Sequence, residues 1–461
     1  GERVASIGFN TRQHLELFLG VSASGTVLHT VNPRLTEDHL EYVLGHGGSR
    51  LVFVDALVAG QLIPLLKRSP RVEKIIQIET DAYEEFLGSA PSNPGASEPL
   101  DERQAAALCY TSGTTGLPKG VLYSHRSNFL HALGICLADG MGVGSRETIL
   151  PIVPLFHANA WGLPHAAGLT GANMVLPGRD TSGDALARLI HSEKVTFTAG
   201  VPTVLSSLLE AADRNPGVLD SLETAVTGGA PMTKSLLDGF ARHGVNLLQG
   251  WGMTETSPNV SLSRPPRETD GTAQAIPYLM SAGRLNAMVD ARLVDAEGKE
   301  LPWDGSAAGE IQLSSPHAAS GYFRNPVAGD ELMDGAWLRT GDLATIDPSG
   351  YVRLKDRMKD LIKSGGEWIP TAELEEVIRS SPGVVDIAVV ARPDERWGER
   401  PVAFVVAQVG SSIDVAELRD YLKSRVPRWW VPDTFEVIDS LPLTSVGKVD
   451  KKALRNQVSA V

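Results

Sequence analysis

Short β-prone runs alternate with helix-like segments over the first half of the chain, and this alternation limits the folds that it can adopt. The expected strands are 3–9, 51–54, 73–78, 148–155, 173–177, 195–202 and 224–231, and the expected helices are 11–22, 159–170, 183–192 and 204–212. Such alternation is typical of an α/β fold. The later strands end in turns that contain Gly or Pro, which is where open α/β sheets bind their ligands.

The segment YTSGTTGLPKGV at residues 110–121 is a candidate for binding an anion. It is too rich in Gly for a helix, and it combines backbone amides, hydroxyls and the Lys119 ammonium, which together suit a nucleotide phosphate. It is not a Walker A loop, because that motif needs Gly before its Lys and Ser or Thr after it, whereas Pro118 and Gly120 flank Lys119. A surface turn rich in Gly and Thr is the alternative.

Composition excludes some partners and locations. The net charge of −13 offers no general attraction to nucleic acid or an anionic membrane, so a polyanionic ligand needs local positive charge. Cys109 and Cys136 lack metal-ligand spacing, and we interpret them as reduced residues of a cytoplasmic protein. No apolar run reaches the roughly 18 residues of a membrane span. The chain starts without Met in a strand-like run, so we expect natural residues to precede it.

The chain changes character from about residue 290 onward. Short strands with hairpins at 296–299 and 347–350 come first, followed by a charged stretch with Gly–Gly at 356–368. The last segments expected are a helix at 371–380, strands at 384–391 and 402–408, a helix at 413–424 and a strand at 434–438. We therefore predict a large α/β domain at 1–355 with a β-rich subdomain, a hinge linker at 356–361 and a small, mobile α+β domain at 362–461.

Six motifs occur in a fixed order along nearly the whole chain. They are YTSGTTGLPKG (110–120), TGGAP (227–231), QGWGMTET (249–256), RTGDLA (339–344), DRMKDLIKSGGEW (356–368) and LPLTSVGKVDKK (441–452). This ordered set resembles the adenylate-forming enzymes, which include acyl-CoA synthetases, adenylation domains of peptide synthetases and luciferases. The stretch PLFHANAWGLPHAAGL at 154–169 looks most like the medium- and long-chain fatty-acyl-CoA synthetases.

The resemblance implies a reaction in two steps. ATP would activate a carboxylic acid as an acyl-adenylate with loss of pyrophosphate, and the thiol of coenzyme A would then displace AMP. ATP, Mg²⁺, CoA and a medium- or long-chain fatty acid are the expected ligands, and a homodimer is left open. One alternative is an aryl or polar acid, or another acceptor such as a carrier-protein thiol. Another is a nucleotide-binding protein without turnover.

The resemblance also implies which residues bind the nucleotide. They are Thr111, Ser112, Gly113, Thr114, Thr115, Gly116, Lys119, Gly228, Gly229, Ala230, Pro231, Gly250, Trp251, Gly252, Thr254, Asp342 and Arg357. Among them, Lys119 would hold the β- and γ-phosphates and Thr254 the α-phosphate, and Glu255 would bind Mg²⁺. Asp342 would bind the ribose, although a turn or helix-cap role is its alternative; for Glu255 the alternative is a solvated loop charge.

The remaining assignments concern the acid, CoA and the hinge. His157 and Trp161 are at i and i+4, so they would share one face if the segment is helical. The resemblance places them, with Gly252, at the acyl pocket, and a core aromatic with a satisfied His is the alternative. The CoA-binding residues would be Lys363, Gly365, Gly366 and Trp368, and the hinge residues Asp356 and Lys359. The catalytic set would be Lys448, Thr254, Glu255 and Lys119, and a solvated basic turn is the alternative for Lys448.

Overall fold

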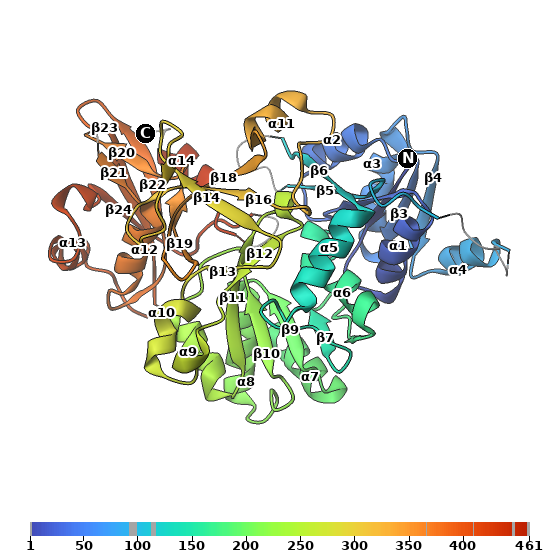
Figure 1. The fold of residues 1–461 in the computed structure, drawn as a ribbon, viewed down its shortest axis with the longest axis horizontal. Coiled ribbons are helices and arrows are strands. Elements are labelled where there is room, and N and C mark those ends of the chain that lie inside the picture. The colour runs from blue at the N-terminus through green and yellow to red at the C-terminus, as the bar shows by residue number, and fades with distance from the viewer. Residues whose placement is uncertain are drawn as a thin grey trace. The chain divides into compact units, whose positions relative to one another are not determined.

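The computed structural model describes residues 2–91, 99–111, 117–365, 367–408, 410–444 and 448–458 (Figure 1). Its internal contacts divide the chain into two compact units. The first unit is Gly1–Ala291 with Leu313–Arg339, and the second is Arg292–Gln312 with Thr340–Val461. Most of the β-rich segment thus belongs to the second unit, and the hinge at 356–361 stays a prediction.

The first sheet of unit 1 has six strands in the order β4-β3-β1-β2-β5-β6, of which only β6 is antiparallel to its neighbour. The strands are β1 (Arg3–Ile7), β2 (Val27–Val31), β3 (Leu51–Asp55), β4 (Lys74–Ile78), β5 (Ala105–Tyr110) and β6 (Gly120–Ser124). The helices between and after them are α1 (Arg12–Ala23), α2 (Glu37–Gly47), α3 (Ala56–Arg68), α4 (Asp81–Gly88) and α5 (His125–Cys136).

The second sheet of unit 1 is parallel from β8 through β7, β9 and β10 to β11, and antiparallel from β11 to β13. The strands are β7 (Thr148–Pro151), β8 (Asn173–Met174), β9 (Phe197–Gly200), β10 (Thr224–Thr227), β11 (Asn246–Gly252), β12 (Asn259–Leu262) and β13 (Gly283–Leu285). The short β17 (Met333–Asp334) of unit 1 pairs instead with Trp337 and Leu338. The helices are α6 (Leu163–Thr170), α7 (Gly183–Glu193), α8 (Pro202–Arg214), α9 (Lys234–Arg242), α10 (Ile276–Leu279) and α11 (Pro326–Leu332).

Helices α7, α8 and α9 flank β9–β11 and share an apolar core with the sheet (Figure 1). Side chains fix where several helices begin, because each helix leaves amides unpaired at its start. Thr11 accepts from the His14 amide at the start of α1, and Ser124 and Ser127 cap α5 reciprocally. Local capping and burial therefore agree on these boundaries.

Unit 2 contains two groups of strands. The first is β14 (Asp290–Val294), β15 (Glu300–Leu301), β16 (Gly309–Ser314), β18 (Trp337–Ile346) and β19 (Tyr351–Arg357), in which β14–β15 and β18–β19 are hairpins. The second is a five-stranded sheet of β20 (Ile362–Ser364), β21 (Glu367–Ile369), β22 (Val384–Asp394), β23 (Gly398–Ala407) and β24 (Thr434–Ile438). Its helices are α12 (Thr371–Arg379), α13 (Val415–Lys423) and α14 (Lys451–Val458).

The predicted order of strands and helices is confirmed, but several strand ends differ by about four residues, as in β7, which ends at Pro151 rather than at residue 155. Both predicted hairpins are present. One prediction is wrong. The helix expected at 159–170 begins only at Leu163, and Ala158–Gly162 form a short irregular turn, η1, with left-handed backbone inside it. Throughout the described ranges, no helix has both the length and the apolar character needed to cross a membrane.

Candidate functional site

The expected phosphate loop leaves β5 and returns at β6. The Thr111 amide donates to the Lys119 carbonyl at 2.9 Å, and the Lys119 amide donates to Thr111 Oγ1 at 3.2 Å. These two bonds close the base of the loop. Ser112, Gly113, Thr114, Thr115 and Gly116 lie outside the described residues. The Lys119 ammonium is 4.9 Å from the centre of the Tyr322 ring.

Glu255 lies in η2 (Thr254–Thr256), the turn after β11, and only 6% of it is exposed. The Tyr322 hydroxyl donates to Glu255 Oε1, and the Ala319 amide donates to the Glu255 carbonyl at 2.7 Å. Burial and then the charge of Glu255 raise the pKa of Tyr322 well above its usual value, so the phenol keeps its proton. The buried Tyr123 hydroxyl donates to the Thr254 carbonyl at 2.6 Å.

Tyr322 is a candidate site residue that sequence reasoning missed. It belongs to the segment 315–323, which packs on the turn after β11: His317 Nδ1 lies 3.0 Å from the Thr256 carbonyl, and the Ser257 hydroxyl donates to the His317 carbonyl at 2.7 Å. A tyrosine carries no charge, and it stands 67 positions from Glu255. No spacing pattern in the sequence could have joined the two.

Gly228 directly after β10, Gly250 within β11 and Trp161 of η1 lie close together. A Cβ added at Gly228 would stand 2.9 Å from the Gly250 carbonyl oxygen and 3.1 Å from Trp161 Cη2. At Gly252 a Cβ would fall 1.8 Å from the Pro258 carbonyl oxygen. Only glycine fits these backbones at such close approach. The structure therefore brings the predicted acyl-side Trp161 against the predicted adenine-side Gly228.

The end of β10 offers an unused polar group. The Thr227 hydroxyl is fully buried and has no hydrogen-bond partner among the described residues, although buried hydroxyls are normally bonded. Gly229, Ala230 and Pro231 follow it and are exposed. The exposed backbone polar groups of these three residues suit a polar ligand such as a nucleotide base, whereas the Thr227 hydroxyl is enclosed. Trp251, on β11, is buried.

The arrangement of His157 and Trp161 differs from the helical prediction. His157 has an extended backbone, and Asn159, Ala160 and Trp161 have positive φ, so the i and i+4 positions do not share a helix face. Side chains hold this turn: Asn159 Nδ2 donates to Asn128 Oδ1 at 3.2 Å. Trp161 is nevertheless buried in an apolar cluster. Tertiary contacts have overridden the helical pattern.

Further bonds anchor the same turn. The Ala158 amide donates to Cys109 Sγ at 3.3 Å. His131 packs so closely on Gly162 that a Cβ at that glycine would lie 2.5 Å from His131 Nδ1. Gly162 has φ 77°, a conformation that favours glycine, and α6 then begins at Leu163 with Pro164 in its first turn. The helix can therefore begin only after the turn.

Asp342 and Arg357 are directly opposed on β18 and β19 of unit 2. Arg357 Nε lies 2.6 Å from Asp342 Oδ1, and the carboxylate is buried whereas the guanidinium is partly exposed. The sequence predicted that these two residues act together across a hairpin, and the structure brings them together. Their role toward a ribose stays a prediction.

The residues predicted to bind CoA lie on the β20–β21 hairpin of unit 2. Lys363 and Trp368 are paired across it, with the ammonium 5.4 Å from the centre of the exposed Trp368 ring. The Gly365 amide donates to the Trp397 carbonyl at 2.7 Å, and a Cβ at Gly365 would meet the Trp397 ring at 2.8 Å. Gly366 lies outside the described residues.

Lys448 stands at the end of a closed loop in unit 2. The Thr444 amide donates to the Lys448 carbonyl at 2.7 Å, and the Lys448 amide donates to Thr444 Oγ1 at 3.2 Å. Of the predicted hinge residues, Asp356 is buried and accepts from the first amides of α12, at Thr371 and Ala372. Burial lowers the pKa of the other, Lys359, below its usual value.

A magnesium ion would find few protein ligands here. In the part of the chain that the structure describes, no three His, Cys, Asp or Glu side chains are grouped as a metal site. Mg²⁺ usually binds through one or two carboxylates together with substrate phosphates, so a dedicated cluster is not required. The buried Glu255 carboxylate fits this mode of binding, because it offers oxygen ligands. Tyr322 contacts both this carboxylate and the Lys119 ammonium.

The chain matches two family models and is similar in sequence to known ligases. Residues 1–323 match the family model of AMP-binding enzymes, and residues 373–448 match that of the AMP-binding enzyme C-terminal domain. The chain is 40% identical over 467 residues to long-chain-fatty-acid–CoA ligase of Thermus thermophilus, covering 99% of this chain and 85% of the relative. It is 39% identical over 471 residues to 3-methylmercaptopropionyl-CoA ligase of Ruegeria pomeroyi, covering 99% and 87%.

The fold is also similar to solved structures. The ATP-bound structure of MatB from Rhodopseudomonas palustris has a TM-score of 0.88 and 26% identity, covering 99% of this chain and 88% of that one. The mixed α/β architecture, with a large amino-terminal domain and a smaller carboxyl-terminal one, agrees with these matches.

Proposed function

We propose that this chain, which belongs to the AMP-binding enzyme family and is an ATP-dependent acid–CoA ligase, activates an apolar acid of medium or long chain. Relatives of nearly equal identity are named for long-chain, medium-chain and 3-methylmercaptopropionic acids. The acid therefore has to be argued from the residues of this chain rather than from one relative.

The reaction needs two displacements. A carboxylate is a poor electrophile, so one of its oxygens first attacks the α-phosphorus of ATP and pyrophosphate leaves. The thiol of CoA then attacks the acyl carbon, the bond to the AMP oxygen breaks, and the thiol proton is released. Both steps depend on neutralised phosphate charge and on substrates held in line.

We assign the phosphates to unit 1. Lys119 supplies a cation and Thr254 lies beside Glu255 on the turn after β11. When bound, Mg²⁺ would further neutralise the triphosphate, and Glu255 is its proposed protein ligand. Tyr322 holds the Glu255 carboxylate by a hydrogen bond and lies under the Lys119 ammonium. This arrangement keeps the two charged groups in place before ATP binds.

We assign the base to the cradle of Gly228, Gly250 and Gly252 with Trp251, and the ribose to the Asp342–Arg357 pair. The contact of Trp161 with Gly228 is the observation that carries the proposal. If Gly228 borders the adenine, an acid against Trp161 has its carboxylate end close to the nucleotide. Adenylation requires that proximity.

An apolar hollow of about 290 Å³ supports the choice of acid. It opens among α1, β5, α5 and α6, and its lining includes Leu19, Phe129, Ala132 and Leu169. Asn128 also lines it and accepts a hydrogen bond from Asn159 in the turn that carries Trp161. We therefore propose that the tail of the acid extends from Trp161 toward this hollow, which suits a hydrocarbon chain better than a charged acid.

ATP–pyrophosphate exchange over a panel of acids, with and without CoA, tests the proposal. The panel contains fatty acids of increasing length, 3-methylmercaptopropionate, benzoate and a dicarboxylate. We expect exchange with medium or long fatty acids and thioester only when CoA is present. Preference for an aryl or charged acid would overturn the substrate assignment, and thioester formation on a carrier protein but not on CoA would contradict the ligase assignment.

A further inference from the structure

The loop that carries Lys448 runs directly into helix α14. The Thr444–Lys448 hydrogen bonds close this loop, and the Asp450 amide donates to the Pro442 carbonyl at 2.8 Å. Asp450 Oδ1 in turn accepts from the first amides of α14, at Lys452 and Ala453. No flexible spacer separates the loop from the helix, so the placement of α14 determines where the Lys448 side chain starts.

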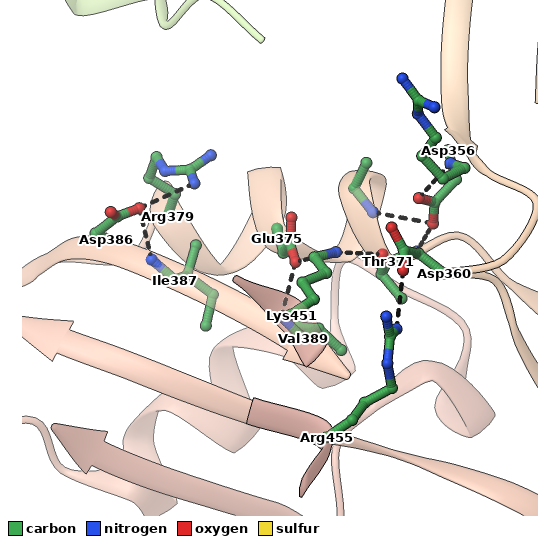
Figure 2. A network of polar contacts seen from close by, with 12 residues as sticks. Asp356, Asp360, Thr371, Glu375, Arg379, Asp386, Ile387, Val389, Lys451 and Arg455 are labelled. Carbon is green, nitrogen blue, oxygen red and sulfur yellow. Dashed lines mark hydrogen bonds and ion pairs between the residues drawn. The ribbon is translucent and has the colours of Figure 1, made fainter. Parts of the chain in front are cut away.

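Both apolar and polar contacts hold α14. The helix has 8 residues, and its buried apolar residues, Leu454 and Val458, pack in a cluster with β22 and β23. Its polar anchors are Lys451 and Arg455, which are four residues apart and so lie on one side of the helix. Arg455 Nη1 is 2.8 Å from Asp360 Oδ1, in the predicted hinge (Figure 2).

Of these two anchors, the ion pair of Lys451 is the more buried. Its ammonium lies 2.7 Å from Glu375 Oε1 and donates to Thr371 Oγ1 at 2.7 Å, both on α12 (Figure 2). The side chains of Lys451 and Glu375 are only 17% and 13% exposed. Glu375 also accepts from the Val389 amide at 2.7 Å, which ties the pair to β22. A buried pair with these extra bonds has a defined geometry.

The same network reaches the predicted hinge. α12 begins after Pro370, which has no side-chain cap to offer, and Asp356 supplies the cap by accepting from the Thr371 and Ala372 amides. The Lys451 ammonium lies at the start of α12, where the positive end of the helix dipole repels a cation. The carboxylates of Asp356 and Glu375 offset this repulsion. Lys451 therefore sits where α14, α12 and the hinge meet, as Figure 2 shows.

We propose that Lys451 is a positioning residue for adenylation: it fixes α14, and with it the loop of Lys448, to α12 and to hinge residue Asp356. This inference rests on the proposed role of Lys448 in the first half-reaction. Lys451 itself is directed at Thr371 and Glu375 and has no part in the chemistry.

The test compares Lys451→Met with Lys452→Met, a matched loss of charge at the exposed neighbouring position. We expect Lys451→Met to lower ATP–pyrophosphate exchange by about ten- to a hundredfold, because a displacement of about 1 Å has such effects. Thioester formation from supplied acyl-adenylate should stay near the wild-type rate, Lys452→Met should match wild type, and Lys451→Arg should restore part of the exchange. Equal losses in both half-reactions would overturn the proposal.

Lys451→Met leaves Glu375 buried without its cation, which can impair folding. The double variant Lys451→Met/Glu375→Gln removes that charge and provides a second folded form. We expect its exchange to stay low; wild-type exchange in this variant would overturn the proposal.

Combining Lys451→Met with Lys448→Ala distinguishes the positioning role of Lys451 from the proposed catalytic role of Lys448. If Lys451 acts through Lys448, Lys451→Met causes no further loss of exchange in the Lys448→Ala background. A further loss of the same factor would overturn the positioning role alone. Unchanged exchange in Lys448→Ala itself would instead overturn the proposed role of Lys448.

Discussion

The Tyr322 hydroxyl donates a hydrogen bond to the Glu255 carboxylate across 67 positions of sequence. The same ring has the Lys119 ammonium 4.9 Å from its centre. One neutral side chain thus contacts both a cation and an anion that the proposed reaction uses on phosphates. Since burial and Glu255 keep the phenol protonated by raising its pKa, the bond persists at neutral pH.

Tyr322→Phe should weaken the use of Mg²⁺ and ATP while the ring contact to Lys119 remains. The variant loses a hydrogen bond to a charged group, worth about 1.5–3 kcal/mol, so exchange at limiting Mg²⁺ should fall by about tenfold or more. Tyr83→Phe is the matched control, because Tyr83 also donates to a glutamate, Glu16, at 3.0 Å. An equal effect of both substitutions would assign Tyr322 a structural role only.

Gly228→Ala should impair adenylation because its methyl group meets atoms on both sides. The added Cβ would stand 2.9 Å from the Gly250 oxygen and 3.1 Å from Trp161, and the cradle would have to open. We expect exchange to fall by about tenfold or more from this misplacement. Gly168→Ala, where nothing lies within 4 Å, is the control and should match wild type. Equal exchange in the two variants would contradict the cradle assignment.

The sequence predicted elements well where local signals and tertiary packing agree. Strand β24 occupies 434–438 as expected, and α12 ends one residue early. The turn at 158–162 shows the opposite case. Its apolar pattern favours a helix, but contacts from Asn128, His131 and Cys109, all distant in sequence, stabilise left-handed backbone instead.

The residues of the candidate site likewise form two groups, those predicted from the sequence and those found only in the structure. Roles were predicted for Glu255 and Asp342 because the motifs that contain them resemble those of a known family, and these roles stay predictions. No role was predicted for Tyr322 or Lys451, since a neutral phenol and one lysine among three carry no local signal. Their contacts depend on packing between distant parts of the chain. Tyr322 donates a hydrogen bond to Glu255, and Lys451 forms an ion pair with Glu375, which is 76 positions away (451 − 375).

Ala132→Leu should shift the enzyme's preference toward acids of shorter chain length. The side chain lines the apolar hollow, and the larger one would occupy part of its volume of about 290 Å³. We expect the ranking of fatty acids in the exchange assay to move toward shorter chains while the KM for ATP stays constant. Overpacking costs about 1–3 kcal/mol of stability, so urea unfolding must be measured alongside. An unchanged ranking in a folded variant would exclude the hollow as the tail site.

Unit 1 should lose stability on acidification below the ordinary histidine range. Burial lowers the pKa of His14 and of His165 to about 4 and that of His29 to about 3. Between the unfolded value of 6.5 and these folded values the unfolded chain binds more protons, so the free energy of unfolding falls as pH falls. The stability is present above pH 6.5 and is lost progressively toward pH 4.

His14→Gln tests this directly. Its ring bonds Ser6 and the Phe9 carbonyl, contacts that a glutamine amide can partly replace without titrating. Between pH 8 and pH 5 the variant should lose about 2 kcal/mol less unfolding free energy than wild type, as measured by urea denaturation at both values. Substitution of the exposed His191 by Gln should leave the pH slope unchanged. The same slope in His14→Gln and wild type would refute the prediction.

Lys448→Ala should separate the two half-reactions. In the first, negative charge accumulates where the acid's carboxylate approaches the α-phosphate, and an ammonium there stabilises the crowded charge. In the second, the thiol needs a path of its own, so we expect the residues beyond the hinge at 356–361 to reorient and remove Lys448 from the reacting atoms. The variant should therefore lose acyl-adenylate formation, measured by pyrophosphate exchange, but keep thioester formation from supplied acyl-adenylate and CoA. The two hydrogen bonds between Thr444 and Lys448 involve the Lys448 backbone with the Thr444 amide and hydroxyl, so alanine at position 448 leaves those bonds available. A loss of both half-reactions by the same factor would mean that Lys448 supports the structure rather than the first chemical step.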